Sequence, residues 1–170
     1  GLAAAHAAGL VHRDVKPENI MIFQRGDEPD VVKILDFGMV KRVDTEHSRN
    51  LTRGLRILGT PLYMAPESLR NPTDADARAD IYAVGCVAFW LLTGKLVFTA
   101  DTAASVMMQH IQAAAPAPST RTELPVPAAL DRAVLACLAK SPDDRPQSAR
   151  ELLRLLDEVA RECRRHGRGA

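Results

Sequence analysis

VHRDVKPENIMIF, residues 11–23, places a carboxylate, an ammonium and an amide at fixed offsets, in Asp14, Lys16 and Asn19. Charged side chains are rarely set among apolar neighbours unless they have partners or a function. An isolated Asp or Asn in a loop is usually a turn residue or a helix cap, and Asn19 taken alone favours that interpretation. The three residues together call for a chemistry that uses all of them.

The composition is that of an ordinary globular protein. Of 170 residues, 46% are hydrophobic and 25% are charged, which suits one well-packed domain. The net charge of +1 predicts no nucleic-acid partner and no membrane contact from this segment. Three cysteines without a CxxC pair favour a reduced, cytoplasmic compartment and no structural zinc. A membrane anchor elsewhere in a parent chain stays open.

The hydrophobic pattern predicts a short hairpin followed by a helical bundle, an α+β fold that is mainly α. Residues 2–8 are typical of the end of an Ala-rich helix, and residues 20–23 and 31–37 are typical of paired strands. The polar, aperiodic stretch 38–61 predicts a functional loop.

Several helices are predicted beyond that loop. Residues 81–92 are apolar on nearly every face, which indicates a buried core helix, and the run 81–94 is too short for a confident membrane span. A second helix is predicted over 101–114. The last two helices show apolar stripes at Leu130, Val134, Cys137 and Leu138, and at Leu152, Leu155, Leu156 and Val159. Residues 160–170 predict a basic, flexible tail.

The polar residues of the opening stretch match the needs of phosphoryl transfer from ATP. That reaction needs metal ions on the phosphates, a carboxylate to orient the attacking hydroxyl, and a cation beside the γ-phosphate. Asp14 and Lys16 supply the carboxylate and the cation, and Asn19 supplies an oxygen for a metal. Asp36 offers a second metal ligand, because the hairpin returns the chain to the neighbourhood of Asn19.

HRDVKPEN, followed by DFG at 36–38 and APE at 65–67, resembles the catalytic half of eukaryotic-type (Hanks-type) serine/threonine protein kinases. The order and spacing of the three motifs are specific, although each alone is short. The resemblance covers residues 1–159 as a partial domain, the C-terminal lobe of the kinase. Lys16 together with GTPLYMAPE is similar to the pattern of serine/threonine kinases, and the sequences of these motifs resemble those of bacterial members of the family.

The resemblance implies roles for individual residues. Asp14 would be the catalytic base, Lys16 would bind and stabilise the transferring phosphate of ATP, and Asn19 and Asp36 would hold Mg²⁺. Regulatory roles would fall to Arg13, which binds a phosphate on the activation loop, to Thr52, which carries that phosphate, and to Thr60, which seats the substrate. Structural roles would belong to His12, Phe37, Asp80, Glu67 and Arg145, the last two as an ion pair.

Simpler interpretations exist for some of these residues. Arg13 alone is compatible with a side chain that only extends its charge to solvent, and Asp80 with an ordinary helix N-cap. Thr52 alone is compatible with a solvated loop residue. The pair of Glu67 and Arg145 concerns the fold and not catalysis.

The sequence lacks the other half of a nucleotide site. No G-x-G-x-x-G and nothing like VAIK occurs in it, and GLRILGT at 54–60 lacks the lysine of a P-loop. We therefore expect the N-terminal lobe to be absent and the fragment alone to be inactive, so that the missing lobe is a partner.

Two hypotheses follow from this. In the first, the chain is part of an active kinase that uses ATP and Mg²⁺ on Ser and Thr residues of proteins. In the second, it is a truncated, non-catalytic module that binds protein partners. The presence of Asp14, Asn19 and Asp36 favours the first, because a binding module has no chemical need for them. A small-molecule phosphotransferase is a weaker third alternative, since the long segment ending in GTPLYMAPE suits a peptide substrate.

Overall fold

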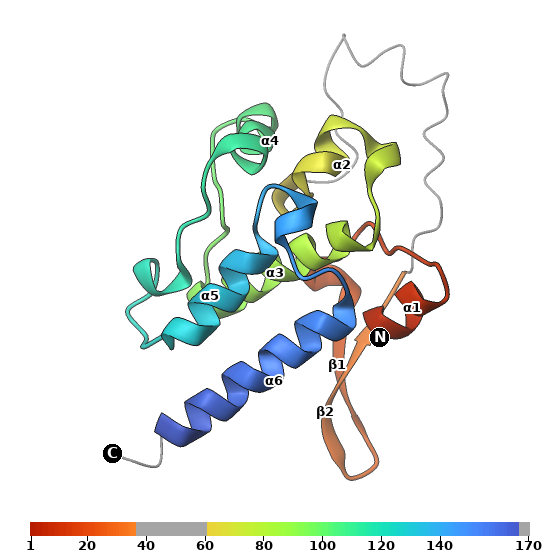
Figure 1. The fold of residues 1–170 in the computed structure, drawn as a ribbon, viewed down its shortest axis with the longest axis vertical. Coiled ribbons are helices and arrows are strands. Elements are labelled where there is room, and N and C mark those ends of the chain that lie inside the picture. Colours follow the sequence, from red (N-terminus) through yellow and green to blue (C-terminus); the bar gives the residue numbers. More distant parts are fainter. Residues whose placement is uncertain (37–60, 167–170) are drawn as a thin grey trace.

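The computed structural model describes residues 1–36 and 61–166, the side chain of His166 excepted. A short N-terminal helix, α1 (Leu2–Ala7), and one hairpin lie beside a group of helices (Figure 1). The described part is therefore mainly helical with one two-stranded antiparallel sheet, as the hydrophobic pattern predicts. Helix α1 ends just before Gly9, which has a φ of 75°.

The hairpin consists of β1 (Ile20–Arg25) and β2 (Glu28–Ile34). Ile20 lies opposite Ile34, and an irregularity in the register falls between Phe23 and Arg25. Strand β1 is two residues longer than predicted, and β2 has the predicted length but begins and ends three residues earlier, because most of the segment taken as the turn is paired. Gly26, with a φ of 59°, provides the left-handed conformation that the tight turn needs.

Five α-helices follow the hairpin in the described residues, and the last of them is longer than expected. Their bounds are α2 (Pro66–Arg70), α3 (Ala77–Thr93), α4 (Ala103–Gln112), α5 (Ala128–Cys137) and α6 (Ala149–His166). Helix α6 thus includes residues 160–166, where the sequence predicts a flexible tail. No helix within 1–36 or 61–166 combines the length and the apolar character that crossing a membrane requires.

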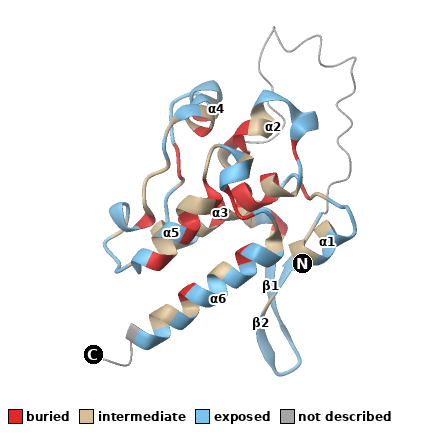
Figure 2. Ribbon diagram, in the orientation of Figure 1, coloured by how far each residue is buried: buried red, intermediate tan, exposed pale blue. Residues whose placement is uncertain are grey.

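Helix α3 forms the centre of the core and carries more buried positions than any other described helix (Figure 2). Its side chains Ile81, Tyr82 and Phe89 have no exposed surface. The helix begins where the Asp76 carboxylate accepts a hydrogen bond from the Arg78 N–H. The sequence predicts a helix buried on all sides, but its last turn is open: Leu91 is 70% exposed.

Close packing of α5 on α3 depends on Gly85. A Cβ atom added there would lie 2.7 Å from Cβ of Cys137 and 3.2 Å from the Leu138 side chain. Both neighbours are buried, so neither can move away easily.

We therefore expect Gly85→Ala to destabilise the fold. Overpacking of this kind costs about 1–3 kcal/mol, which outweighs the gain of about 1 kcal/mol from replacing glycine in a helix. Urea unfolding measures the difference, and the expected result is a lower midpoint. A higher midpoint, which helix propensity alone would give, would contradict this packing argument.

Candidate active site

The carboxylate of Asp80 holds the backbone of the loop that contains the HRD motif. Asp80 lies in the first turn of α3 and is 1% exposed. Its Oδ2 accepts a hydrogen bond from the His12 N–H and its Oδ1 one from the Arg13 N–H, both at 2.8 Å. Arg13 has a φ of 64°, a conformation that is costly for a residue with a side chain. The two charge-assisted bonds stabilise that conformation.

A third donor to Asp80 comes from His6, which no motif in the sequence indicates. The imidazole Nε2 of His6 donates to Asp80 Oδ2 at 2.8 Å. Its only signal in the sequence is that it is the single polar residue of α1. Asp80 therefore connects the first helix, the HRD loop and the core helix, although these segments lie far apart in the sequence.

His12 connects the HRD loop to the residue that precedes Asp36. The Asp14 N–H donates to His12 Nδ1 at 3.2 Å, so Nδ1 is an acceptor and the ring proton belongs on Nε2. His12 Nε2 then donates to the carbonyl of Leu35 at 2.8 Å. The Leu35 N–H in turn donates to the carbonyl of Asn19 at 2.8 Å. Asp36 is thereby tethered, through its neighbour, to both His12 and Asn19.

Asp14, Lys16 and Asn19 meet at the side chain of Asp14. Lys16 Nζ donates to Asp14 Oδ2 at 2.8 Å, and Asn19 Nδ2 donates to the same oxygen at 3.1 Å and to the Asp14 carbonyl at 2.7 Å. Asn19 is 7% exposed, whereas the Asp14 side chain is 49% exposed. The carboxylate is thus fixed in position from within the fold and open to a substrate from outside.

A cleft of about 420 Å³ opens beside this carboxylate. One wall is polar and includes Asp14, Lys16 and Glu18, and the other includes Leu62 and Met64 from the segment before α2. Tyr63 also lines the cleft. Burial, and then the charge of Glu18, raise the pKa of Tyr63 above its usual value, so its phenol keeps its proton at neutral pH.

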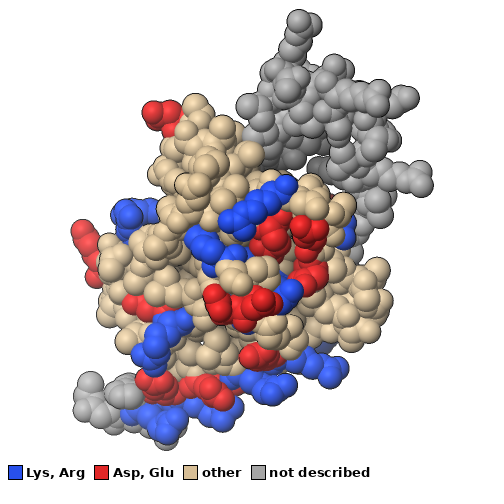
Figure 3. Space-filling model, turned by 45° about the horizontal axis from the view of Figure 1, so that its top comes forward, with Lys and Arg blue, Asp and Glu red and all other residues tan. Residues whose placement is uncertain are grey.

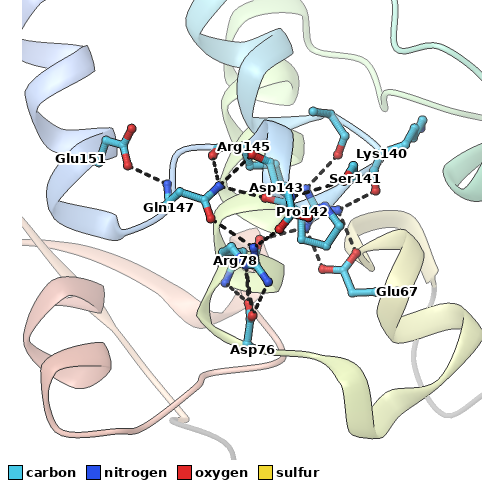
Figure 4. Close-up of polar contacts among 11 residues, drawn as sticks. Glu67, Asp76, Arg78, Lys140, Ser141, Pro142, Asp143, Arg145, Gln147 and Glu151 are labelled. Carbon is cyan, nitrogen blue, oxygen red and sulfur yellow. Dashed lines mark hydrogen bonds and ion pairs between the residues drawn. The ribbon is translucent and has the colours of Figure 1, made fainter.

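Glu67 and Arg145 belong to a separate polar cluster, none of whose labelled residues lines the cleft (Figure 4). Arg145 lies on the connection between α5 and α6, and its guanidinium donates to both oxygens of Glu67 at 2.7 and 2.8 Å. The Arg145 side chain is 0% exposed and the Glu67 side chain 12%. The guanidinium carbon also lies 4.9 Å from the centre of the Tyr82 ring. This pair fastens the first turn of α2 to the connection between α5 and α6.

The surface charge of the described residues does not form one area of a single sign on the face in Figure 3. Basic and acidic side chains are interspersed across that face.

With this geometry in place, comparison with known proteins identifies the family. Residues 1–156 match the family model described as the protein kinase domain. The chain belongs to the protein kinase family. The resemblance that the HRD, DFG and APE motifs predict is confirmed.

Curated relatives of this kinase chain include bacterial serine/threonine kinases. It is 43% identical over 166 residues to serine/threonine-protein kinase pkn3 of Myxococcus xanthus, a match that covers 96% of the chain and 30% of the relative. It is 43% identical over 162 residues to PknL of Mycobacterium tuberculosis, with coverage of 95% and 38%. It is 41% identical over 149 residues to PknB of Mycolicibacterium smegmatis, with coverage of 87% and 23%. The chain spans well under half the length of these relatives.

The structure brings together some of the predicted site residues of the kinase motifs and leaves others undescribed. Asp14, Lys16 and Asn19 are in direct contact, and Asp36 follows a residue bonded to Asn19. Glu67 and Arg145 contact each other and not this group. The functional roles of these six residues stay predictions. Three further predicted residues lie outside the described ones, and their roles also stay predictions: Phe37, Thr52 and Thr60.

Proposed function

We propose that this chain is the C-terminal lobe of a protein kinase that transfers the γ-phosphoryl group of ATP to Ser and Thr residues of proteins. The observation that carries the proposal is the half-exposed carboxylate of Asp14, held by Lys16 and Asn19 at the edge of a cleft. In phosphoryl transfer, catalysis comes mainly from positioning and electrostatic stabilisation, and this arrangement provides both.

Asp14 acts on the substrate hydroxyl. Its carboxylate is open to the cleft, so a Ser or Thr hydroxyl there can donate its hydrogen bond to it and be aligned for attack. The Asp14 carboxylate then accepts the proton that the hydroxyl loses. Lys16, whose ammonium lies 2.8 Å from Asp14 Oδ2, places a positive charge beside the position of the transferring phosphate.

Asn19 and Asp36 have the chemistry of a Mg²⁺ site. Carboxylate and amide oxygens are ligands that Mg²⁺ prefers. Asn19 uses its amide nitrogen for two bonds to Asp14, which leaves its oxygen Oδ1 for a cation. When bound, Mg²⁺ neutralises charge on the phosphates of ATP. The contribution of the chain is to hold Asn19 rigid through Asp14 and Asp36 near it through Leu35.

The nucleotide site is completed by a Gly-rich loop and a strand lysine, which the 170 residues do not contain. We therefore expect the 170-residue polypeptide alone to show no measurable phosphoryl transfer, because the positioning of ATP is lost. The same chain joined to an N-terminal kinase lobe is expected to phosphorylate Ser and Thr in a protein substrate.

Radiolabelled ATP and phosphoamino-acid analysis measure both activities. Asp36→Ala serves as the control in each case, since it removes a proposed metal ligand. Transfer by the polypeptide alone that disappears in Asp36→Ala would refute the dependence on a second lobe. A correctly folded, joined protein without any activity would refute the kinase assignment and support a partner-binding module.

A further inference from the structure

A second hollow lies between the connection from α3 to α4 and the connection from α4 to α5. These two connections run side by side between α4 and the rest of the bundle (Figure 1). The hollow has a volume of about 530 Å³. It shares no lining residue with the cleft at Asp14. A ligand here would therefore not compete with the substrate hydroxyl for the catalytic residues.

The lining of this hollow combines an apolar floor with two positive charges. Val97 and Phe98 are each 7% exposed and form part of its floor, while Ala113 and Pro116 come from the opposite connection. The two positive charges are those of Lys95 and Arg121, and no Asp or Glu lines the hollow among the described residues. The other lining residues are Leu96, Thr99, Gln109 and Ala114.

The two cationic side chains have no partner among the described residues. Lys95 and Arg121 are exposed, and neither side chain makes an ion pair or a hydrogen bond to another residue in 1–36 or 61–166. Some other arginines in the described part do have ion-pair partners. Arg78 binds Asp76 and Asp143, and Arg25 binds Glu28. Within residues 1–36 and 61–166, therefore, no side chain compensates the charge of Lys95 or Arg121 by an ion pair.

The hollow is preformed by contacts in its walls. Gln109 Nε2 donates to the carbonyl of Thr99 at 3.2 Å and so joins α4 to the preceding connection. The Phe98 ring packs edge-on to the buried His110 ring at 5.0 Å, and Lys140 Nζ lies 4.5 Å from the Phe98 ring centre. A ligand would pay little conformational entropy for ordering this site.

We propose that this hollow docks an acidic segment of the protein substrate, with one apolar side chain over Phe98 and carboxylates at Lys95 and Arg121. The apolar floor suits a side-chain anchor, and the two unpaired cations select the sign of the flanking charges. The identification of the occupant as a substrate rests on the proposed kinase function. A nucleic acid is a poorer fit, because the lining offers only two cations and one aromatic ring.

Direct binding tests the site without any need for activity. The probe is a fluorescein-labelled dodecapeptide with a central Phe between Glu and Asp residues, and anisotropy reports its binding to the chain. Lys95→Glu combined with Arg121→Glu is expected to weaken peptide binding about tenfold. Each variant side chain loses its exposed ion pair with a peptide carboxylate and repels that carboxylate instead. Arg154→Glu, an exposed position on α6, makes the same kind of charge change elsewhere and is expected to have no effect.

The peptide itself supplies a second control. Replacing its Phe with Ser is expected to weaken binding, and a peptide with Lys and Arg in place of its acidic residues is expected to bind less well than the acidic one. Equal binding of the acidic peptide to the wild type and to the double variant would overturn the proposal. So would tighter binding of the basic peptide, or of a single-stranded oligonucleotide.

Activity of the chain joined to an N-terminal lobe then separates this proposal from the proposed function. The double variant is expected to raise KM for a protein substrate that carries an acidic segment, with kcat unchanged and with normal turnover of a short Ser peptide. Turnover of both substrates with the same KM in wild type and variant would overturn docking but leave the kinase assignment intact. Peptide binding without any turnover in the joined protein would refute the kinase assignment. The hollow would then still be a site for acidic peptides, but its partner would not be a kinase substrate.

Discussion

Replacement of Arg145 with methionine is expected to lower the free energy of unfolding by about 3–5 kcal/mol, the usual cost of breaking a buried ion pair. The Arg145 side chain has no exposed surface, so no water replaces its contacts. All the donor groups of its guanidinium are used: two go to Glu67, and the others go to the carbonyls of Ala139, Arg78 and Lys140. The variant leaves a nearly buried carboxylate and three carbonyls without these donors.

Urea unfolding of the purified chain measures this effect. Arg132→Met is the matched control, because Arg132 Nη2 lies 3.9 Å from Glu162 Oε2 and the two side chains are 68% and 46% exposed. That exposed pair is expected to contribute at most about 1 kcal/mol. Arg145→Lys is expected to be destabilising too, since an ammonium has three donors and cannot bind Glu67 in the same planar way. A loss below that of Arg132→Met would contradict the structural role assigned to Arg145.

The double variant Glu67→Leu with Arg145→Met separates the ion pair from the rest of the cluster. Removing both charges avoids an unpaired buried carboxylate, and such replacements are often neutral in proteins. Here we expect only partial recovery, because the carbonyls of Ala139 and Lys140 still lose their donor. Full recovery would show that these backbone contacts contribute little.

Local patterns in the sequence predict much of the fold, because short-range chemistry determines those parts. The β-rich runs IMIF and VVKILDF on either side of the turn-forming segment QRGDEPD predict the hairpin, and the apolar run from Ile81 predicts the core helix. Asp14, Lys16 and Asn19 are close in sequence, so the contacts among their side chains are also local. The resemblance to the kinase family predicts the ion pair between Glu67 and Arg145, which no local pattern indicates.

Contacts between distant segments are the part that the sequence alone does not reveal. His6 and Asp80 are 74 residues apart, and a single histidine in an Ala-rich helix has no periodicity that points to a partner. The end of α6 was missed for another reason. Its basic composition suggests fraying, but Cys163 continues the apolar stripe one turn beyond Val159 and packs with Ala129 and Ala133 of α5. That packing extends the helix past the expected end.

Asp14→Asn is expected to reduce kcat/KM on a Ser peptide by at least about 100-fold in the chain joined to an N-terminal lobe, since general-base catalysis contributes about 10²–10⁴-fold. An amide has nearly the shape of the carboxylate but cannot accept the proton of the hydroxyl. Stability is expected to change by no more than about 0.5 kcal/mol, because the side chain is half exposed and Asn19 keeps its bond to the Asp14 carbonyl.

Glu18→Gln is the matched control for this variant, because Glu18 is another carboxylate of the same cleft and has no assigned role in the chemical step. It removes the same amount of negative charge, so a general electrostatic effect of the cleft would slow both variants alike. We expect Glu18→Gln to stay within tenfold of the wild type, while Asp14→Asn loses turnover with an unchanged unfolding curve. Turnover of Asp14→Asn close to that of Glu18→Gln would mean that the carboxylate at position 14 neither orients the hydroxyl nor accepts its proton.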